Sequence, residues 1–228
     1  YYGIVNNSGI AKPELVFEIP DVYTEERMYP PTRDLTSSSH TISGADYGNG
    51  LYETEQSDET YHPDVIAFSA FNEDAISTTH GPHFNNTYNS GSFTGDSYIV
   101  ADYLGEWVKI KLPVAIKLTK YGFKQRIPSY EARSPGQYKI YGSNNGTTWS
   151  ELVYKTTTIN YTNNQFEESV TTTEVYTYFV LVVNQLFGSN NYLNFDEWYI
   201  FGKELIPSTT PPANKFRLLE LENNKLDK

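Results

Sequence analysis

The chain has 228 residues and a formal net charge of −11, because 28 acidic residues outnumber 17 basic ones. This balance argues against nucleic acid and anionic membrane as partners, since both attract basic protein surfaces. The chain has no cysteine, so its core has to come from apolar burial, and its 20 tyrosines and 12 phenylalanines favour β-structure.

The N-terminal part is predicted to contain only short strands. Residues 1–27 form a polar lead segment with one strand over residues 15–19, which a proline stops. The breaker at residues 29–31 (YPP) marks the start of the main domain. Two weak strands are expected over residues 40–43 and 50–55.

The strand pattern becomes clearer in the middle of the chain. Residues 64–71 are a compact apolar run, which is typical of a buried strand, and residues 72–97 form a long polar loop. Apolar residues alternate over residues 106–112, after which a proline is predicted to end the strand. Over residues 116–125 the apolar phase switches sides, which predicts a bulge near Thr119.

A hairpin follows this region. Residues 138–141 and 148–155 are predicted as its strands, and Asn145-Gly146 supplies the positive φ that a tight turn needs. Trp149 is expected to cover the edge of the sandwich, because large aromatic side chains dominate burial.

Two strands complete the series, one over residues 174–183 at the centre of a sheet and one over residues 193–201. Residues 205–228 are a Pro/Thr linker and a charged tail. Many strands at short spacing with turn signals between them indicate an all-β sandwich or barrel.

The order of these elements resembles that of a known family. The motifs that carry the resemblance are residues 29–31, AFNED at 70–74, Thr79-His80, GEWVKIKLP at 105–113, YGFKQR at 121–126, SPGQYKIYGSNNGTTW at 134–149 and LNFDEWYIFG at 193–202. Together they resemble the discoidin domain, or coagulation-factor type C domain, in its cysteine-free version from large DNA viruses of protists and from protist surface proteins. The resemblance implies an eight-stranded antiparallel jelly-roll β-sandwich over residues 28–204, the galactose-binding-like fold.

The family also implies a structural calcium ion after the Ala-Phe motif. By resemblance its ligands are backbone carbonyls, Asn72, Asp74, Ser77 and Glu197, and oxygen is the ligand that calcium prefers. Asn72 and Glu73 depart from the Asp and Gly of the family, and a Gly position often has positive φ. The alternative is that Glu197 and Asp74 are solvated or paired at the end of the sheet.

Family ligands sit on the loops at one end of the sandwich. A sugar site needs an aromatic face and planar hydrogen-bonding groups. The loop residues that offer them are His80, His83, Phe84, Asn85, Tyr88, Arg126 and Tyr130. For Arg126 the alternative is a surface ion pair. Phe187, Asn190, Asn191 and Tyr192 form a second polar and aromatic cluster, for which the alternative is ordinary turn composition.

The predicted function is a non-catalytic carbohydrate-binding or adhesion module of a larger extracellular, cell-surface or virion-surface protein, whose partner is a glycan or glycoprotein surface. The chain has neither a cysteine nucleophile nor a Gly-x-Ser-x-Gly elbow, so catalysis is not expected. Sequons at Asn6, Asn85, Asn145 and Asn160 fit a surface protein. Two alternatives remain open: a structural subunit of a capsid or surface assembly that contacts neighbouring protein subunits, and an accessory module of a catalytic domain.

Overall fold

The computed structural model describes residues 2–7, 10–15, 21–57, 66–73, 81–84, 86–101, 103–126 and 129–207. Contacts within the chain divide it into two units, Thr24–Leu205 and Tyr1–Tyr23 with Ile206–Lys228. The latter contains the antiparallel pair β1 (Tyr2–Asn7) and β2 (Ile10–Leu15), and β3 (Val22–Tyr23). The strand predicted over residues 15–19 falls mostly outside the described residues. Within the described ranges, no helix has the length and apolarity that crossing a membrane requires.

Eight strands of four residues or more build the unit Thr24–Leu205. They are β5 (Ser39–Ile42), β6 (Gly50–Gln56), β9 (Glu106–Lys124), β10 (Pro135–Ser143), β11 (Ser150–Lys155), β12 (Gln165–Ser169), β13 (Tyr176–Leu186) and β14 (Glu197–Ile206). Shorter elements join them: β4 (Arg27–Tyr29), β7 (Tyr88–Asn89), β8 (Ser92–Phe93) and the 3-10 helices η1 (Ala67–Phe71) and η2 (Glu131–Arg133). The strand pairs are antiparallel, so the predicted all-β jelly-roll is confirmed.

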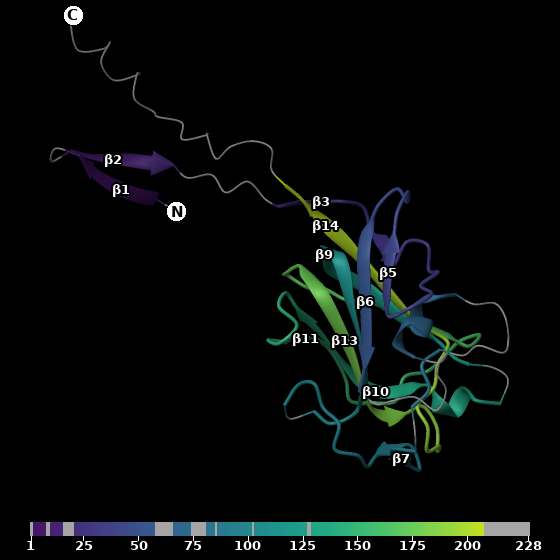
Figure 1. Cartoon of the computed structure of the whole chain (residues 1–228). Coiled ribbons are helices and arrows are strands. Elements are labelled where there is room, and N and C mark those ends of the chain that lie inside the picture. The colour runs from purple at the N-terminus through teal and green to yellow at the C-terminus, as the bar shows by residue number, and fades with distance from the viewer. Residues whose placement is uncertain are drawn as a thin grey trace, which may run out of the picture. The chain divides into compact units, whose positions relative to one another are not determined.

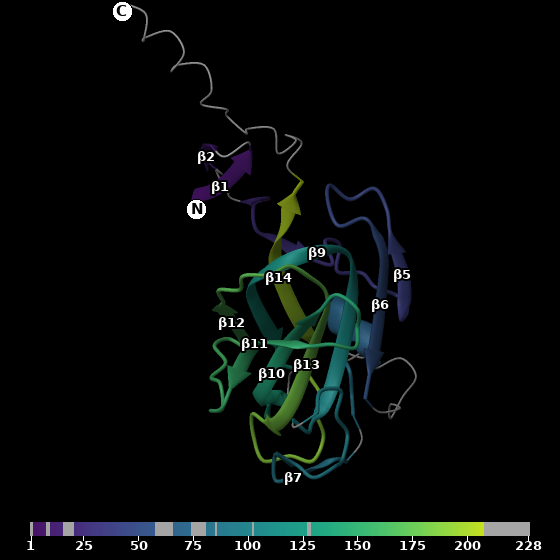
Figure 2. The same cartoon turned by 90° about the vertical axis from the view of Figure 1, so that its left-hand side faces the viewer.

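The long strand β9 belongs to both layers of the sandwich. Its first half pairs with β13 and β6, where Ile110 lies opposite Phe179 and Thr54. Its second half pairs with β14 and β12, where Phe123 lies opposite Trp198 and Phe166. Figures 1 and 2 show how β9 arches from one layer to the other. The core therefore forms between two sheets that share one bent strand.

The bend of β9 corrects one prediction and confirms another. Pro113 does not end the strand, because the chain turns there from one sheet into the other and the ladder to β13 shifts its register nearby. In the second half of β9, Lys120 pairs with Phe201 of β14 and Leu118 pairs with Gly202, which leaves Thr119 as an extra residue. The bulge predicted near Thr119 is thus confirmed.

The buried strand predicted over residues 64–71 is wrong for its described part, since residues 67–71 form η1. Their burial was predicted correctly, because Ala70 and Phe71 are fully buried in the core. A short apolar run at the wall of a core has the same composition in either conformation.

The predicted hairpin is confirmed as β10 and β11, with Tyr138 opposite Lys155. Gly146 has the positive φ that the turn needs, at +73°. The Asn145 side chain stabilises the turn by accepting hydrogen bonds from the backbone N–H groups of Thr147 and Thr148. Trp149 packs against a small apolar cluster on β10 and β13, so its predicted packing role is confirmed.

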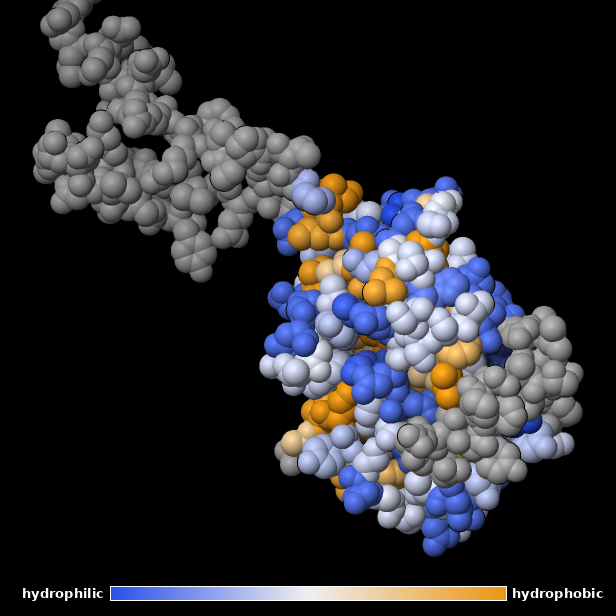
Figure 3. Space-filling view, viewed as in Figure 1, coloured by the Kyte–Doolittle hydropathy of each residue, from blue (hydrophilic) through white to orange (hydrophobic). Residues whose placement is uncertain are grey.

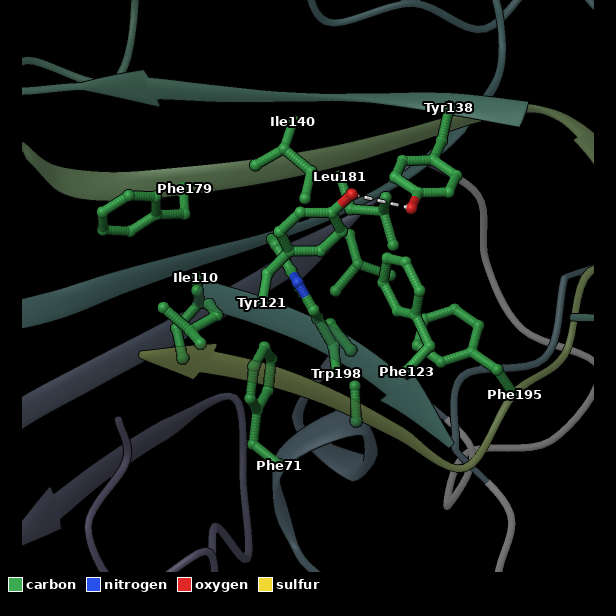
Figure 4. Packing of buried hydrophobic residues seen from close by; sticks show 14 of the residues in the cluster. Phe71, Ile110, Tyr121, Phe123, Tyr138, Ile140, Phe179, Leu181, Phe195 and Trp198 are labelled. Atoms are coloured by element: carbon green, nitrogen blue, oxygen red, sulfur yellow. Dashed lines mark hydrogen bonds between the residues drawn. The ribbon is translucent and has the colours of Figure 1, made fainter. Parts of the chain in front are cut away.

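The core combines aliphatic side chains with many aromatic rings (Figure 4), and a chain of polar groups connects two of these rings to the sheet edge. The Tyr121 hydroxyl donates a hydrogen bond of 2.8 Å to Glu168 and lies 3.0 Å from the Tyr138 hydroxyl. Because Tyr121 has only one hydroxyl proton, Tyr138 is the donor in the second bond. Lys155 donates to Glu168 at 2.6 Å, which links the buried hydroxyls to the sheet edge.

This direction predicts unequal effects of two similar changes. Tyr138→Phe removes one hydrogen bond and should lower the free energy of unfolding by about 1 kcal/mol. Tyr121→Phe removes two bonds and leaves the Tyr138 hydroxyl buried without a partner, so it should cost about 2–3 kcal/mol. Urea unfolding of both variants measures the difference, and equal losses would contradict the assigned direction.

Candidate functional site

Three chain segments converge at the end of the sandwich where β14 begins (Figure 1): residues 81–84, the connection from β9 to β10, and the connection from β13 to β14. Backbone hydrogen bonds join them. Phe84 N–H donates to the Leu193 carbonyl at 3.0 Å, and Asn194 N–H donates to the Arg133 carbonyl at 3.0 Å. The loops are therefore fixed to one another as well as to the sheets.

Asn194 is the buried residue that connects these segments. Its side-chain amide donates to the carbonyls of Gly81 and Pro82, at 3.1 Å each, and its amide oxygen accepts from Arg126 Nη1 at 3.0 Å. Gly81 allows the approach, because a Cβ atom there would lie 1.8 Å from the Phe195 carbonyl oxygen. Asn194 thus positions Arg126 relative to residues 81–84.

Five half-buried side chains meet above Asn194 and form what we call the arginine–tyrosine cluster: His83, Arg126, Tyr130, Arg133 and Tyr192. The guanidinium groups of Arg126 and Arg133 lie 4.0 and 4.6 Å from the centre of the Tyr130 ring. Arg133 also lies 5.0 Å from the centre of Tyr192, whose ring meets His83 edge-on at 5.7 Å. Cations and aromatic rings alternate through the cluster.

The two guanidinium groups differ in their surroundings. Burial lowers the pKa of Arg126, and the positive charge of Arg133 lowers it further, while Tyr130 and Asp196 oppose the shift. Arg133 has no ion pair and no side-chain hydrogen bond among the described residues, and its Nε is buried without a partner. Like charges placed close together favour the binding of an anion.

The structure unites only part of the predicted ligand site. His83, Arg126 and Tyr130 come together, and Tyr192 joins them from the second predicted cluster. Phe84 and Tyr88 do not belong to this surface, because they are 0% and 2% exposed.

Tyr88 is held inward by a hydrogen bond of 2.8 Å from its hydroxyl to the Val183 carbonyl. In the second predicted cluster, Phe187 packs edge-on against Tyr161 at 5.3 Å, and Asn190 accepts hydrogen bonds from the backbone N–H groups of Asn191 and Tyr192. The turn-forming alternative therefore describes Asn190. The predicted ligands His80 and Asn85 lie outside the described residues.

Sequence analysis missed Arg133 and Asn194. Arg133 ends η2, seven residues after Arg126, and this spacing gives no sign that both reach Tyr130. Asn194 stands inside a motif that carries the family resemblance, but its polar character next to the buried neighbours Leu193 and Phe195 was the available signal. A buried amide in an apolar run has to find hydrogen-bond partners.

One residue of the implied calcium site, Glu197, already has a buried partner of opposite charge. The Glu197 carboxylate forms an ion pair with Arg33, and the two side chains are 2% and 1% exposed. Arg33 also donates to the Ala70 carbonyl at 3.3 Å, beside the segment where the calcium was expected. A cation bound by Glu197 would meet this buried guanidinium. The paired-carboxylate alternative therefore describes Glu197.

Of the other expected calcium ligands only Asn72 is described. Asp74 and Ser77 lie outside the described residues. Glu73 adopts φ of +42°, so the chain keeps a left-handed conformation where the family has Gly. Asn72 is described next to it.

Comparison with solved structures identifies the fold. A family 32 carbohydrate-binding module from NanJ of Clostridium perfringens, solved in complex with galactose, matches with a TM-score of 0.50 and 14% identity, over 77% of this chain and 98% of that one. The chain thus shares the jelly-roll β-sandwich fold of that module.

Two further solved structures are similar. CBM32-3 from a family 31 glycoside hydrolase of C. perfringens has a TM-score of 0.49 and 20% identity, over 66% of this chain and 90% of that one. Chitosan-binding module 1 from a chitosanase/glucanase of Paenibacillus sp. IK-5 has a TM-score of 0.42 and 18% identity, over 65% and 93%. No family model and no curated protein sequence matches the chain.

The Arg33–Glu197 pair leads to a stability prediction. Arg33→Met leaves Glu197 buried without its counterion and should lower the free energy of unfolding by about 3–5 kcal/mol. Arg33→Met combined with Glu197→Gln should cost less than the sum of the two single changes. Urea unfolding gives all three values, and additive losses would contradict a direct pair. Arg27→Met is a matched control, since Arg27 pairs with Glu204 at 3.6 Å in a partly exposed site and should contribute about 0–1 kcal/mol.

Proposed function

We propose that Thr24–Leu205 is a non-catalytic module that binds glycans through the arginine–tyrosine cluster. The observation that carries this proposal is the convergence of His83, Arg126, Tyr130, Arg133 and Tyr192 from three segments onto buried Asn194. Further support comes from the fold, because the NanJ module that shares it was solved in complex with galactose.

The chemistry of the cluster suits sugar hydroxyl groups. Guanidinium N–H groups donate hydrogen bonds, while phenol and imidazole groups either donate or accept them. The Asn194 amide is hydrogen-bonded to Arg126 and to the carbonyls of Gly81 and Pro82, so it holds the cluster in place. Direct contacts with a glycan would then come from the half-buried side chains of the cluster. Polar groups fixed in advance lose little conformational freedom on binding.

The position of the cluster suits a module within a longer protein. The unit begins at Thr24, whose N–H donates to the Glu204 carbonyl at 2.9 Å near the far end of β14. The cluster lies at the other end of β14, about 30 Å away for ten residues. A surface placed there points away from the connections of the unit. We propose an extracellular, cell-surface or virion-surface setting, in which several weak sites add up to adhesion.

The alternative of a structural subunit predicts a large apolar contact surface. On the face seen in Figure 3, apolar residues are scattered among hydrophilic ones. This distribution favours the glycan-binding proposal for that face.

A glycan array probed with the full chain tests the proposal. We expect binding to a defined set of glycans, with galactosides as the first probe. Tyr192→Ala should weaken this binding by about tenfold or more, since it removes a ring that orients both Arg133 and His83. Arg27→Gln is the matched control, because Arg27 lies 4.9 Å from the centre of the Tyr47 ring outside the cluster, and it should leave binding unchanged. A blank array from a folded sample would reject glycan binding in favour of the structural alternative.

We further propose that the module works without calcium, and the support is the guanidinium group that already neutralises Glu197. Adding about 1 mM calcium or a chelator should move the melting temperature by less than about 1 °C. A site that is about 99% filled would stabilise the fold by about 2.7 kcal/mol and raise the melting temperature by several degrees. Thermal unfolding with calcium and with chelator measures the shift, and a rise of that size with calcium would contradict this proposal.

A further inference from the structure

We infer that the arginine–tyrosine cluster selects glycans that carry an anionic group, a carboxylate or a sulfate ester, over neutral glycans. This inference rests on the proposed glycan binding and names the class of ligand. It follows from three features of the cluster: how its rings are covered, which charges lack partners, and how its two cations are spaced.

The tyrosine rings of the cluster are already in contact with cations. Arg126 and Arg133 both approach the centre of the Tyr130 ring, at 4.0 and 4.6 Å, and Arg133 lies 5.0 Å from the centre of Tyr192. A neutral sugar is typically held by stacking its C–H surface on an open aromatic face. Here those faces hold the guanidinium groups in place, so the arginines are what the cluster presents to a ligand.

Within the described ranges Arg133 has no carboxylate partner, unlike Arg27 and Arg33. Arg33 pairs with Glu197, and Arg27 pairs with Glu204 at 3.6 Å. Among the described residues Arg133 contacts two aromatic rings but no acid, and its Nε is buried without a hydrogen-bond partner. Guanidinium groups bind carboxylate and sulfate-like oxyanions through two parallel hydrogen bonds. An anionic ligand group would pair with the half-buried guanidinium through its Nη groups, since Nε is itself buried.

The two cations of the cluster also repel each other. Arg126 and Arg133 share the Tyr130 ring, and the charge of Arg133 adds to burial in lowering the pKa of Arg126. An anion bound between them would relieve this repulsion.

Two acidic residues lie close by and have other partners. Asp196 attracts Arg126 but also forms an ion pair of 3.4 Å with Lys124. Glu131 accepts a hydrogen bond of 3.3 Å from the Ser129 N–H through its carboxylate.

The net charge of −11 does not oppose this inference at short range. At physiological ionic strength charges are screened over about 8 Å, so the groups in contact with the ligand decide its binding. The overall charge should instead slow the approach of an anionic polymer. The cluster is therefore a local cationic site on an acidic protein.

The test measures, by isothermal titration calorimetry, the affinity of the full chain for three classes of glycan: neutral galacto-oligosaccharides, oligogalacturonates and sulfated galactans. We expect one or both anionic classes to bind about tenfold or more tightly than the neutral class. Raising the salt from about 0.05 to about 0.5 M should weaken anionic binding severalfold. The better of the two anionic classes identifies the group as a carboxylate or a sulfate ester.

Variants connect this preference to the cluster. Arg133→Gln should reduce the ratio of the affinities for anionic and neutral glycans to about one. Arg133→Lys should restore part of this ratio, because lysine carries the positive charge but cannot form the bidentate hydrogen bonds of arginine. Arg27→Gln should leave the ratio unchanged. Neutral glycans that bind as tightly as anionic ones, or an unaltered ratio in Arg133→Gln, would overturn the inference while glycan binding stands. If no class binds to the folded protein, both the inference and the proposed function fail.

Discussion

The buried ion pair between Arg33 and Glu197 is the constraint on which the loop end of the sandwich depends. Glu197 is the first residue of β14, and Arg33 joins it to η1 through the Ala70 carbonyl and to the Tyr199 ring at 4.6 Å. Burial lowers the pKa of Arg33 to about 10, which leaves the guanidinium charged at neutral pH. Because both charges are out of water, neither can leave without exposing the other to a large desolvation cost. The start of β14 is thereby fixed, and Asn194 lies only three residues before it.

This arrangement explains how a rigid site can rest on irregular loops. The start of β14 fixes the position of Asn194. The side chain of Asn194 in turn holds Arg126 and the carbonyls of Gly81 and Pro82 by hydrogen bonds. These hydrogen bonds hold the base of the arginine–tyrosine cluster in place. The Arg33 guanidinium pairs with Glu197 and donates hydrogen bonds to the carbonyls of Ala70 and Trp198. A loop end held by such bonds responds to substitutions in the core as well as to those on its surface.

The sequence predicted the strands well because alternating apolar residues report a local property, the burial of one face. The bulge at Thr119 was visible for the same reason, since it shifts that alternation. The continuity of β9 through Pro113 was not visible, because a proline breaks the ladder of one sheet but is tolerated where a strand passes between two sheets. The 3-10 helix η1 was mistaken for a strand because five apolar or small residues carry no period.

The candidate site was predicted only in part because its side chains come from distant segments. Polar and aromatic loop composition predicted His83, Arg126 and Tyr130 correctly. It also predicted Phe84 and Tyr88, which are buried in the core. Composition cannot tell an aromatic ring that faces solvent from one that closes the core beneath it. Arg133 became visible only when the ring contacts across the three segments were known, and the polar character of Asn194 in an apolar run gave no sign of which groups it bonds.

Two arginines of the protein, Arg33 and Arg133, lie against tyrosine rings but differ in whether a carboxylate pairs with them. In the interior, the Arg33 guanidinium lies 4.6 Å from the centre of the Tyr199 ring, and Glu197 completes its environment. At the loop end, Arg133 lies between the Tyr130 and Tyr192 rings, and no carboxylate among the described residues completes its environment. An aromatic ring offsets only part of the desolvation of a guanidinium group, and an oxyanion offsets the rest. The paired arrangement of Arg33 stabilises the fold, and the unpaired arrangement of Arg133 leaves the position of the oxyanion to a ligand.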